Sequence, residues 1–336
     1  MIEQVLHKID HLLKKANFET FTLDNFTNKK SKFCFDLLVK KKDLIFSVKV
    51  FSNIDNLNPD IVNDIKSLSL LLKSKPLLIG IKNRYEKLED NKIYIREGLP
   101  FITLNTLEAI LEKDLYPYIL AKRGGGVIFL DGNLMKTLRE KNSITRKELS
   151  ELLGVTKRTV CAYETESMRP SEAIANKIYN VLESKEIFKR INILKWNIQF
   201  NFDQKEFLDE IDLNDFESHI QNVINDIGIS SYWYRKGPVP FKLSIYSKLF
   251  DPQQESGFYP LFSGLSEDKE KLNQFNLNCL KLFTNLFHKN ALFIINNNIK
   301  ISEAFKKNNI PIVKIKDLEK INDEDEFIEL IQESQK

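Results

Sequence analysis

The sequence predicts a multidomain protein in which a small all-α module lies between two α/β domains. Two observations predict this arrangement. The chain has 336 residues, which exceeds the size at which a single hydrophobic core keeps growing, so several cores are expected. Apolar residues with strand-like and helical spacing alternate within residues 1–121 and again within 188–336, whereas residues 132–187 follow helical spacing.

The composition indicates a globular protein without an overall polycationic character. Hydrophobic residues make up 42% of the chain and 24 residues are Phe, which is ample material for several cores. The 50 basic and 47 acidic residues give a net charge of +3, so affinity for nucleic acid must come from a local patch. The three cysteines form no CxxC pair, which indicates neither a disulfide framework nor a zinc site.

The N-terminal residues and the apolar runs bear on localisation. Residues 1–15 carry charges throughout and lack the apolar core and cleavage site of a signal peptide. No run elsewhere approaches the roughly 18 apolar residues that a membrane-spanning helix requires. We therefore expect a soluble, cytoplasmic protein that has no membrane partner.

The first domain is expected over residues 1–121. Apolar spacing predicts a helix over 2–15, strands over 18–23, 33–40 and 43–51, and a helix over 60–73. Pro76 ends that helix before a strand at 77–81, and a strand at 99–104 precedes a helix at 106–111. Residues 122–131 contain three consecutive glycines and are expected to form a flexible linker.

Short apolar patterns recur in the same order in the C-terminal domain, residues 188–336. Residues 75–79 resemble 290–294, and residues 99–110 resemble 310–321 without a gap. Earlier in the two domains, residues 35–36 correspond to 241–242, and residues 51–52 correspond to 262–263. The shared order predicts a degenerate duplication that flanks the central module. The alternative is that any two α/β domains share such patterns.

The central module, residues 132–187, is expected to contain five short helices. Leu134, Met135 and Leu138 give the first helix its apolar face. Thr145 and Glu148, three residues apart, predict a capping box at the start of the second helix. The apolar residues of that helix are expected to face inward: Leu149, Leu152 and Leu153.

A short turn and two further helices follow. Gly154 is expected to supply the left-handed or tight backbone conformation that the turn requires. Thr156 then caps a third helix, whose buried face would contain Val160 and Tyr163. Residues 170–171 open a fourth helix. The outer side of the third helix would carry Lys157, Arg158, Cys161 and Ala162.

This run of residues resembles the helix-turn-helix domain of the Cro and phage-repressor family. The matching positions are Glu148-Leu149, Leu153-Gly154-Val155-Thr156, Thr159-Val160, Tyr163-Glu164 and Arg169-Pro170-Ser171. The chain departs from the family at Glu166, where a glycine usually follows the Tyr-Glu pair. In this family the third helix lies in the major groove of DNA, and its first residues meet base edges.

The resemblance implies that the partner is double-stranded DNA. Lys157 and Arg158 become candidates for base readout, since both side chains suit the acceptors of guanine. Arg146 and Arg169 occupy positions where the family contacts phosphate or positions the helix, which gives affinity rather than sequence choice. The complete set of implied DNA-binding residues is Arg146, Thr156, Lys157, Arg158, Thr159, Ala162 and Arg169.

The local charge supports this interpretation. Residues 136–158 contain seven basic and three acidic residues, so the net charge of this window, +4, exceeds that of the whole chain. The alternative is a four-helix interaction module with solvated lysines. Oxidation of Cys161 near the groove would alter binding, although a small side chain tolerated near DNA is the plainer interpretation.

The first domain resembles the restriction-endonuclease-like core. That family places an Asp and a Glu-x-Lys on adjacent strands, because two carboxylates hold Mg²⁺ and the lysine orients or activates water. Asp36 and Lys49 match this pattern, but Ser47 occupies the Glu position and supplies no charge. In the expected second copy, Lys242 replaces the Asp and Pro260 stands near the Lys position. We therefore expect two nuclease-like folds without nuclease activity.

The order of domains resembles a family of archaeal helix-turn-helix transcriptional regulators. This resemblance implies a sequence-specific transcriptional regulator. We expect a homodimer, because each chain carries one helix-turn-helix module (residues 132–187), which we call the reading head. We expect no cofactor and no metal site, since His7 and His11 lack a third ligand nearby in sequence. Two alternatives stay open: a Mg²⁺-dependent, structure-selective nuclease or resolvase-like enzyme, and an adaptor that does not bind DNA. The flanking domains would serve dimerisation, further DNA contact or sensing of an effector.

Overall fold

The computed structural model describes residues 2–22, 33–122, 125–196, 212–235, 240–249, 251, 257–267, 274–301 and 310–334. The chain divides into two compact units, each made of separate segments. The first comprises Met1–Leu12, Val50–Asn56 and Leu77–Ile198, and the second comprises Leu13–Lys49, Leu57–Pro76 and Gln199–Lys336. No helix in the described ranges combines the length and the apolar character that crossing a bilayer requires.

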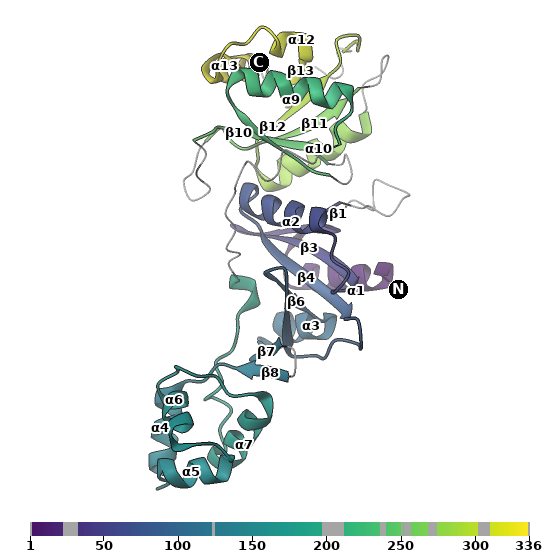
Figure 1. The fold of residues 1–336 in the computed structure, drawn as a ribbon. Coiled ribbons are helices and arrows are strands. Elements are labelled where there is room, and N and C mark those ends of the chain that lie inside the picture. The colour runs from purple at the N-terminus through teal and green to yellow at the C-terminus, as the bar shows by residue number, and fades with distance from the viewer. Residues whose placement is uncertain are drawn as a thin grey trace. The chain divides into compact units, whose positions relative to one another are not determined.

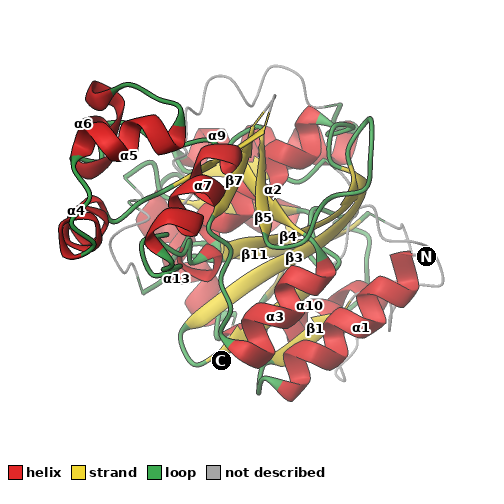
Figure 2. Ribbon diagram, turned by 90° about the horizontal axis from the view of Figure 1, so that it is seen from below, coloured by secondary structure: helices red, strands yellow, loops and turns green. Residues whose placement is uncertain are grey.

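The N-terminal region builds an eight-stranded mixed sheet with the strand order β1-β2-β3-β4-β6-β5-β7-β8. Its strands are β1 (Glu19–Thr22), β2 (Leu37–Lys41), β3 (Leu44–Asn53), β4 (Lys75–Lys82), β5 (Lys92–Arg96), β6 (Leu99–Ile102), β7 (Ile119–Lys122) and β8 (Gly125–Ile128). Its helices are α1 (Ile2–Lys15), α2 (Pro59–Leu71) and α3 (Leu104–Lys113). Figure 2 shows α1 and α3 side by side, where Lys8 pairs with Glu108 at 2.8 Å.

A strand replaces the flexible linker that was expected over residues 122–131. β8 pairs antiparallel with β7 in this segment. Gly126 has a packing role there, because a Cβ at this position would lie 2.4 Å from the side chain of Ile119. The N–H of Ile128 donates to the carbonyl of Pro170 at 3.1 Å. The described part of the segment therefore attaches the central module to the sheet.

The central module contains four helices rather than the five expected. Figure 1 shows α4 (Gly132–Lys141), α5 (Arg146–Leu153), α6 (Lys157–Glu164) and α7 (Glu172–Leu182) gathered in one bundle. Helix α7 ends where Glu183 takes a φ of 54°, and the short 3-10 helix η1 (Ile193–Lys195) follows. The buried core of the bundle contains Met135, Leu149, Leu153, Val160, Tyr163, Ala175 and Ile178.

The prediction that Leu152 faces inward was wrong, because its side chain is 57% exposed. Helix α5 has eight residues and buries the i, i+4 pair Leu149 and Leu153. An apolar residue that lies between these two in sequence points away from the narrow contact that so short a helix makes.

The C-terminal region builds a five-stranded sheet with the order β13-β12-β11-β10-β9. Its strands are β9 (Ser230–Trp233), β10 (Leu243–Tyr246), β11 (Leu261–Ser266), β12 (Ala291–Ile295) and β13 (Ile312–Lys314). Its helices are α9 (Asp215–Ile227), α10 (Gln274–Phe287), α12 (Ile315–Leu318) and α13 (Glu324–Glu333). The fold is thus a helix-turn-helix module between two α/β regions.

The two sheets follow the same plan of elements and pairing. In each, two antiparallel strand pairs lead into a helix and a further strand, so β1, β2, β3, α2 and β4 correspond to β9, β10, β11, α10 and β12. Leu78 lies opposite Phe101, and Phe293 lies opposite Ile312. These registers support the expected matches of residues 75–79 with 290–294 and of 99–102 with 310–313.

One expected match is four residues out of register. Leu37 lies opposite Val48 in the first sheet, and Leu243 lies opposite Ser263 in the second. Because residues 35–36 and 241–242 precede equivalent strands, Val48 corresponds to Ser263, and the match of residues 51–52 with 262–263 was wrong. A shift of four residues preserves the two-residue alternation of a strand, so the apolar pattern alone did not distinguish the two registers.

We call the N-terminal sheet with its helices the first half and the C-terminal sheet with its helices the second half. Residues of the two halves contact each other within the second compact unit. Phe21 on β1 and Tyr232 on β9 are equivalent, since they lie opposite Leu38 and Ser244 in matching registers. The ring of Phe21 packs edge-on against Phe283 of α10. The hydroxyl of Tyr232 donates to Asp64 of α2 at 2.8 Å. Each half therefore packs its first strand against the central helix of the other.

Candidate nucleic-acid interface

The start of α5 and the turn between α5 and α6 have the local contacts and backbone conformation that the sequence predicts. The Thr145 hydroxyl accepts from the N–H of Glu148 at 3.1 Å, and the Glu148 carboxylate accepts from the N–H of Thr145 at 2.7 Å. This capping box is confirmed. Gly154 ends α5 with a φ of 69°, in the left-handed region that favours glycine. The Thr156 hydroxyl then caps α6 by accepting from the N–H of Thr159 at 3.1 Å.

Helix α6 presents its first residues to solvent. Val160 and Tyr163 are buried in the bundle, as predicted. The side chains of Thr156, Lys157 and Arg158 are exposed on the outer side, and those of Thr159, Cys161 and Ala162 are partly exposed. The structure therefore brings five of the seven side chains expected to bind DNA onto one short helix and its cap.

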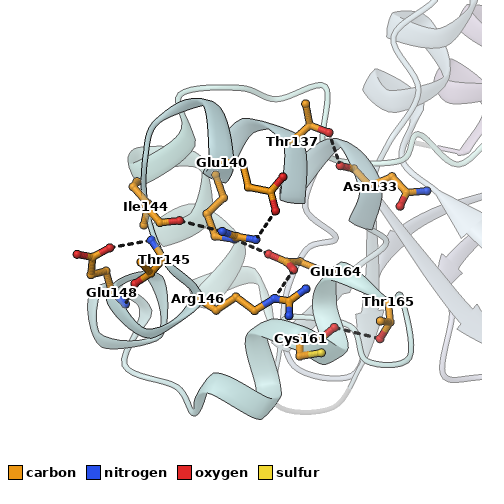
Figure 3. A network of polar contacts seen from close by, with 11 residues as sticks. Asn133, Thr137, Glu140, Ile144, Thr145, Arg146, Glu148, Cys161, Glu164 and Thr165 are labelled. Atoms are coloured by element: carbon orange, nitrogen blue, oxygen red, sulfur yellow. Dashed lines mark hydrogen bonds and ion pairs between the residues drawn. The ribbon is translucent and has the colours of Figure 1, made fainter.

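A buried carboxylate ties α6 to the two helices that precede it. Glu164, whose side chain is 2% exposed, accepts from Nε of Arg139 at 2.6 Å and from Nε of Arg146 at 2.7 Å. Arg139 also donates to the carbonyl of Ile144 at 2.9 Å. Figure 3 shows the side chains of Arg146 and Glu164 pointing toward each other in this network. Because the carboxylate accepts from one guanidinium group on α4 and one on α5, it fixes the position of α6 relative to these two helices.

The two arginines expected at phosphate have structural contacts in addition. The Glu164 carboxylate raises the pKa of the Arg146 guanidinium, whose side chain stays partly exposed. The guanidinium of Arg169 lies 3.9 Å from the centre of the Phe129 ring. Such a cation–π contact orients the side chain while it remains at the surface. Both side chains are held in place before any ligand arrives.

The residue that departs from the family pattern keeps the backbone shape of a glycine. Glu166 has a φ of 58°, in the left-handed region. Its carboxylate accepts from the N–H of Gly132 at 3.1 Å and from Lys189 Nζ at 2.5 Å. Lys189 lowers the pKa of this carboxyl group. These two contacts offset the strain of a side chain at a glycine position.

The nuclease-like position of the first sheet is assembled but incomplete. Lys49 Nζ lies 3.1 Å from Asp36 Oδ1 and donates to the carbonyl of Phe33 at 2.7 Å. The two charged side chains are 9% and 13% exposed. Ser47 is buried beside them, and its hydroxyl has no hydrogen-bond partner among the described residues. Asp36 and Lys49 meet as the sequence predicted, without a second carboxylate.

The corrected register changes the residues that stand at this position in the second half. Phe262 takes the place of Ser47, and Gly264, rather than Pro260, takes the place of Lys49. Lys242 replaces the aspartate and pairs with Glu217 of α9 at 3.2 Å. The charge of the aspartate is thus reversed, and the charge of the lysine is lost. Within the ranges that the structure describes, no three His, Cys, Asp or Glu side chains form a group that could hold a metal ion.

The C-terminal half packs closely around the nuclease-like position of the first. The ring of Phe33 lies 5.6 Å from that of Tyr234 and 5.5 Å from that of Phe241. Asp64, on α2, is fully buried and also accepts from the N–H of Arg235 at 3.2 Å. Burial raises the pKa of Asp64 to about 7. This carboxyl group therefore joins the two halves by hydrogen bonds.

Comparison with known proteins identifies both types of domain. Residues 2–117 match the PD-(D/E)XK superfamily domain, and residues 135–187 match the helix-turn-helix family. The second match covers α5, α6 and α7, where the exposed side chains gather. Sequence reasoning had placed both domains and missed the Glu164 network, which joins residues far apart in the chain.

Several archaeal proteins are similar to the chain along most of its length. One from Methanocaldococcus jannaschii is 28% identical over 300 residues, which is 89% of this chain and 88% of that protein. One from Pyrococcus abyssi is 25% identical over 336 residues, or 98% of this chain and 97% of its own. Each bears the name "Putative HTH-type transcriptional regulatory protein". No solved structure matches the chain.

Replacing Glu164 by Gln is expected to destabilise the bundle strongly. The variant removes the buried counter-charge of Arg139 and leaves only the exposed Glu140 beside it, which costs about 3 kcal/mol in the free energy of unfolding. Denaturant unfolding of the full chain measures this loss. Glu140→Gln is the matched control, because Glu140 pairs with the same arginine at 3.2 Å but is 55% exposed. Its effect is expected within about 0.5 kcal/mol; equal effects of the two variants would contradict the assigned role of Glu164.

Proposed function

Because the chain carries a PD-(D/E)XK superfamily domain and a helix-turn-helix domain, and resembles archaeal proteins named as transcriptional regulators, we propose that it is a sequence-specific DNA-binding regulator of transcription. The observation that carries the proposal is the outer face of α6. A capped helix with exposed cationic side chains at its first turn, held by a buried carboxylate, is suited to enter the major groove.

We assign base readout to the first turn of α6. Arg158 suits the O6 and N7 acceptors of guanine in a bidentate contact, and Lys157 suits the same acceptors singly. Thr156, Thr159 and Ala162 would line the same groove. Arg146 and Arg169, which the structure holds at the surface, would contact phosphates and set the register of α6 on the duplex.

The substitution Arg158→Ala tests the readout. We expect it to cost about 1–3 kcal/mol at a site selected in vitro by the wild-type protein and to relax the base preference at one position. Binding isotherms and a repeated selection measure the two effects. Arg190→Ala removes the same charge from an exposed position outside the four helices and should change neither. Equal affinity of all three proteins for the selected site would exclude α6 as the reading helix.

We also propose that two chains bind together as a homodimer. One chain supplies one reading head, so a symmetric operator needs two heads, about 34 Å apart on the duplex. Sedimentation at micromolar concentration should therefore detect a species of twice the chain mass without DNA, and two chains bound to one duplex when the selected duplex is present. A monomer under both conditions would contradict this part of the proposal.

A second candidate function, Mg²⁺-dependent cleavage of DNA, is favoured by one observation. Asp36 and Lys49 pair in a domain that matches the PD-(D/E)XK superfamily. Ser47 supplies no charge where a carboxylate would bind the cation. The Lys49 ammonium is already paired with Asp36 and donates to the carbonyl of Phe33. We therefore propose that this domain has no nuclease activity.

Incubation of the full chain with Mg²⁺ and with duplex or branched DNA is expected to leave both substrates intact. Gel electrophoresis of end-labelled DNA measures this. Asp36→Asn serves as the control for contaminating nuclease, since it removes the remaining carboxylate of the pair. Cleavage by the wild-type chain that disappears in Asp36→Asn would establish the enzyme instead.

A further inference from the structure

The turn between β4 and β5 presents an aromatic side chain to solvent. We call residues 82–88 the β4–β5 tip. Tyr85, at its end, is 87% exposed, and the neighbouring side chains of Arg84 and Lys87 are exposed as well. An aromatic ring between two cations combines an apolar face with positive charge, and both are available for contact with an anionic partner.

The tip is held by hydrogen bonds rather than left to vary. The side-chain oxygen of Asn83 accepts from the N–H groups of Tyr85 and Glu86, each at 2.8 Å. The N–H of Arg84 donates to Asp55 at 2.8 Å. Leu88 is buried below the turn and anchors its far end. The backbone that carries the aromatic ring is therefore held in one conformation, which lowers the entropic cost of binding.

The charge of the tip is positive. Lys82 and Lys87 face each other across an antiparallel bridge, with Arg84 between them in the sequence. In the described ranges, no acidic side chain forms an ion pair with these three cations. The acids that follow are engaged elsewhere: Glu89 with Lys92 at 2.9 Å, and Asp90 with Thr103 and Asn105. Glu86 is the one acid within the tip.

The tip is connected to the reading head within the same compact unit. Lys92, at the start of β5, pairs with Glu89 and also with Glu172 at 2.8 Å. Glu172 is the first residue of α7, three residues after Arg169, for which we proposed a phosphate contact. Lys92 is thereby shared between the end of the β4–β5 turn and the edge of the proposed interface.

We propose that the β4–β5 tip is a second DNA contact, which binds the duplex beside the site that α6 reads. The ring of Tyr85 would pack against a deoxyribose of the backbone, and Arg84 and Lys87 would neutralise flanking phosphates. A contact of this kind adds affinity without adding sequence preference. The inference rests on the proposed function, because it needs DNA already placed on α6.

The test compares two duplexes that contain the same selected site. The short one carries two base pairs on each side, and the long one carries about 20, or two helical turns, on each side. Tyr85→Ala is expected to weaken binding of the full chain to the long duplex about tenfold, by loss of the contact between the ring and the sugar. Arg84→Ala should lower the slope of log affinity against log salt by about one on that duplex. On the short duplex both variants should bind as the wild type does.

Two control variants test whether the aromatic ring and the position of the charge are responsible for the effect. Tyr85→Phe keeps the ring and should bind the long duplex as the wild type does. Lys113→Ala removes an exposed charge at the end of α3 and should change neither duplex. Wild-type affinity of Tyr85→Ala for the long duplex, or equal losses on both duplexes, would overturn the second contact while leaving the role of α6 intact. Failure of the wild-type chain to bind either duplex would overturn both proposals.

Discussion

The buried carboxylate of Glu164 is the interaction on which the geometry of the reading head depends. It lies at the C-terminal end of α6 and accepts from Arg139 of α4 and Arg146 of α5, so three helices meet at one charged group. A buried ion pair contributes little net stability against an apolar alternative, but it tolerates only one arrangement of its partners. One of these two arginines, Arg146, occupies a position where we expect the DNA backbone. Structural order and ligand contact are therefore coupled through Arg146.

In the two α/β regions, the positions that correspond to a nuclease site make structural contacts. In the first half, Asp36 and Lys49 still meet, yet the lysine is used by a backbone carbonyl and the second carboxylate is replaced by Ser47. In the second half, the corresponding charge is reversed and satisfied by Glu217. Each half also covers the other through its first strand and its central helix. A further carboxylate of the first half, Asp64, accepts from Tyr232 and Arg235 and so joins the two halves.

Local rules predicted what depends on neighbouring residues. The capping box at Thr145 and the left-handed Gly154 follow from short spacings, and both are present. The local pairing of β7 with β8 escaped prediction, because a run of three glycines is as typical of a flexible joint as of closely paired strands. Pairing over long sequence separations escaped prediction as well. The bond between Arg139 and Glu164 joins residues 25 positions apart. One signal was available: Arg139 follows Met135 by four residues on the apolar face, where a charge requires a partner.

Protection of guanine N7 from methylation tests the central claim most directly, because this atom lies in the major groove. The wild-type chain, bound to a duplex selected in vitro, should protect one or more guanines of the selected site, and Arg158→Ala should leave at least one of them reactive. Binding of the duplex without any protection in the major groove would contradict the account of α6 as the reading helix.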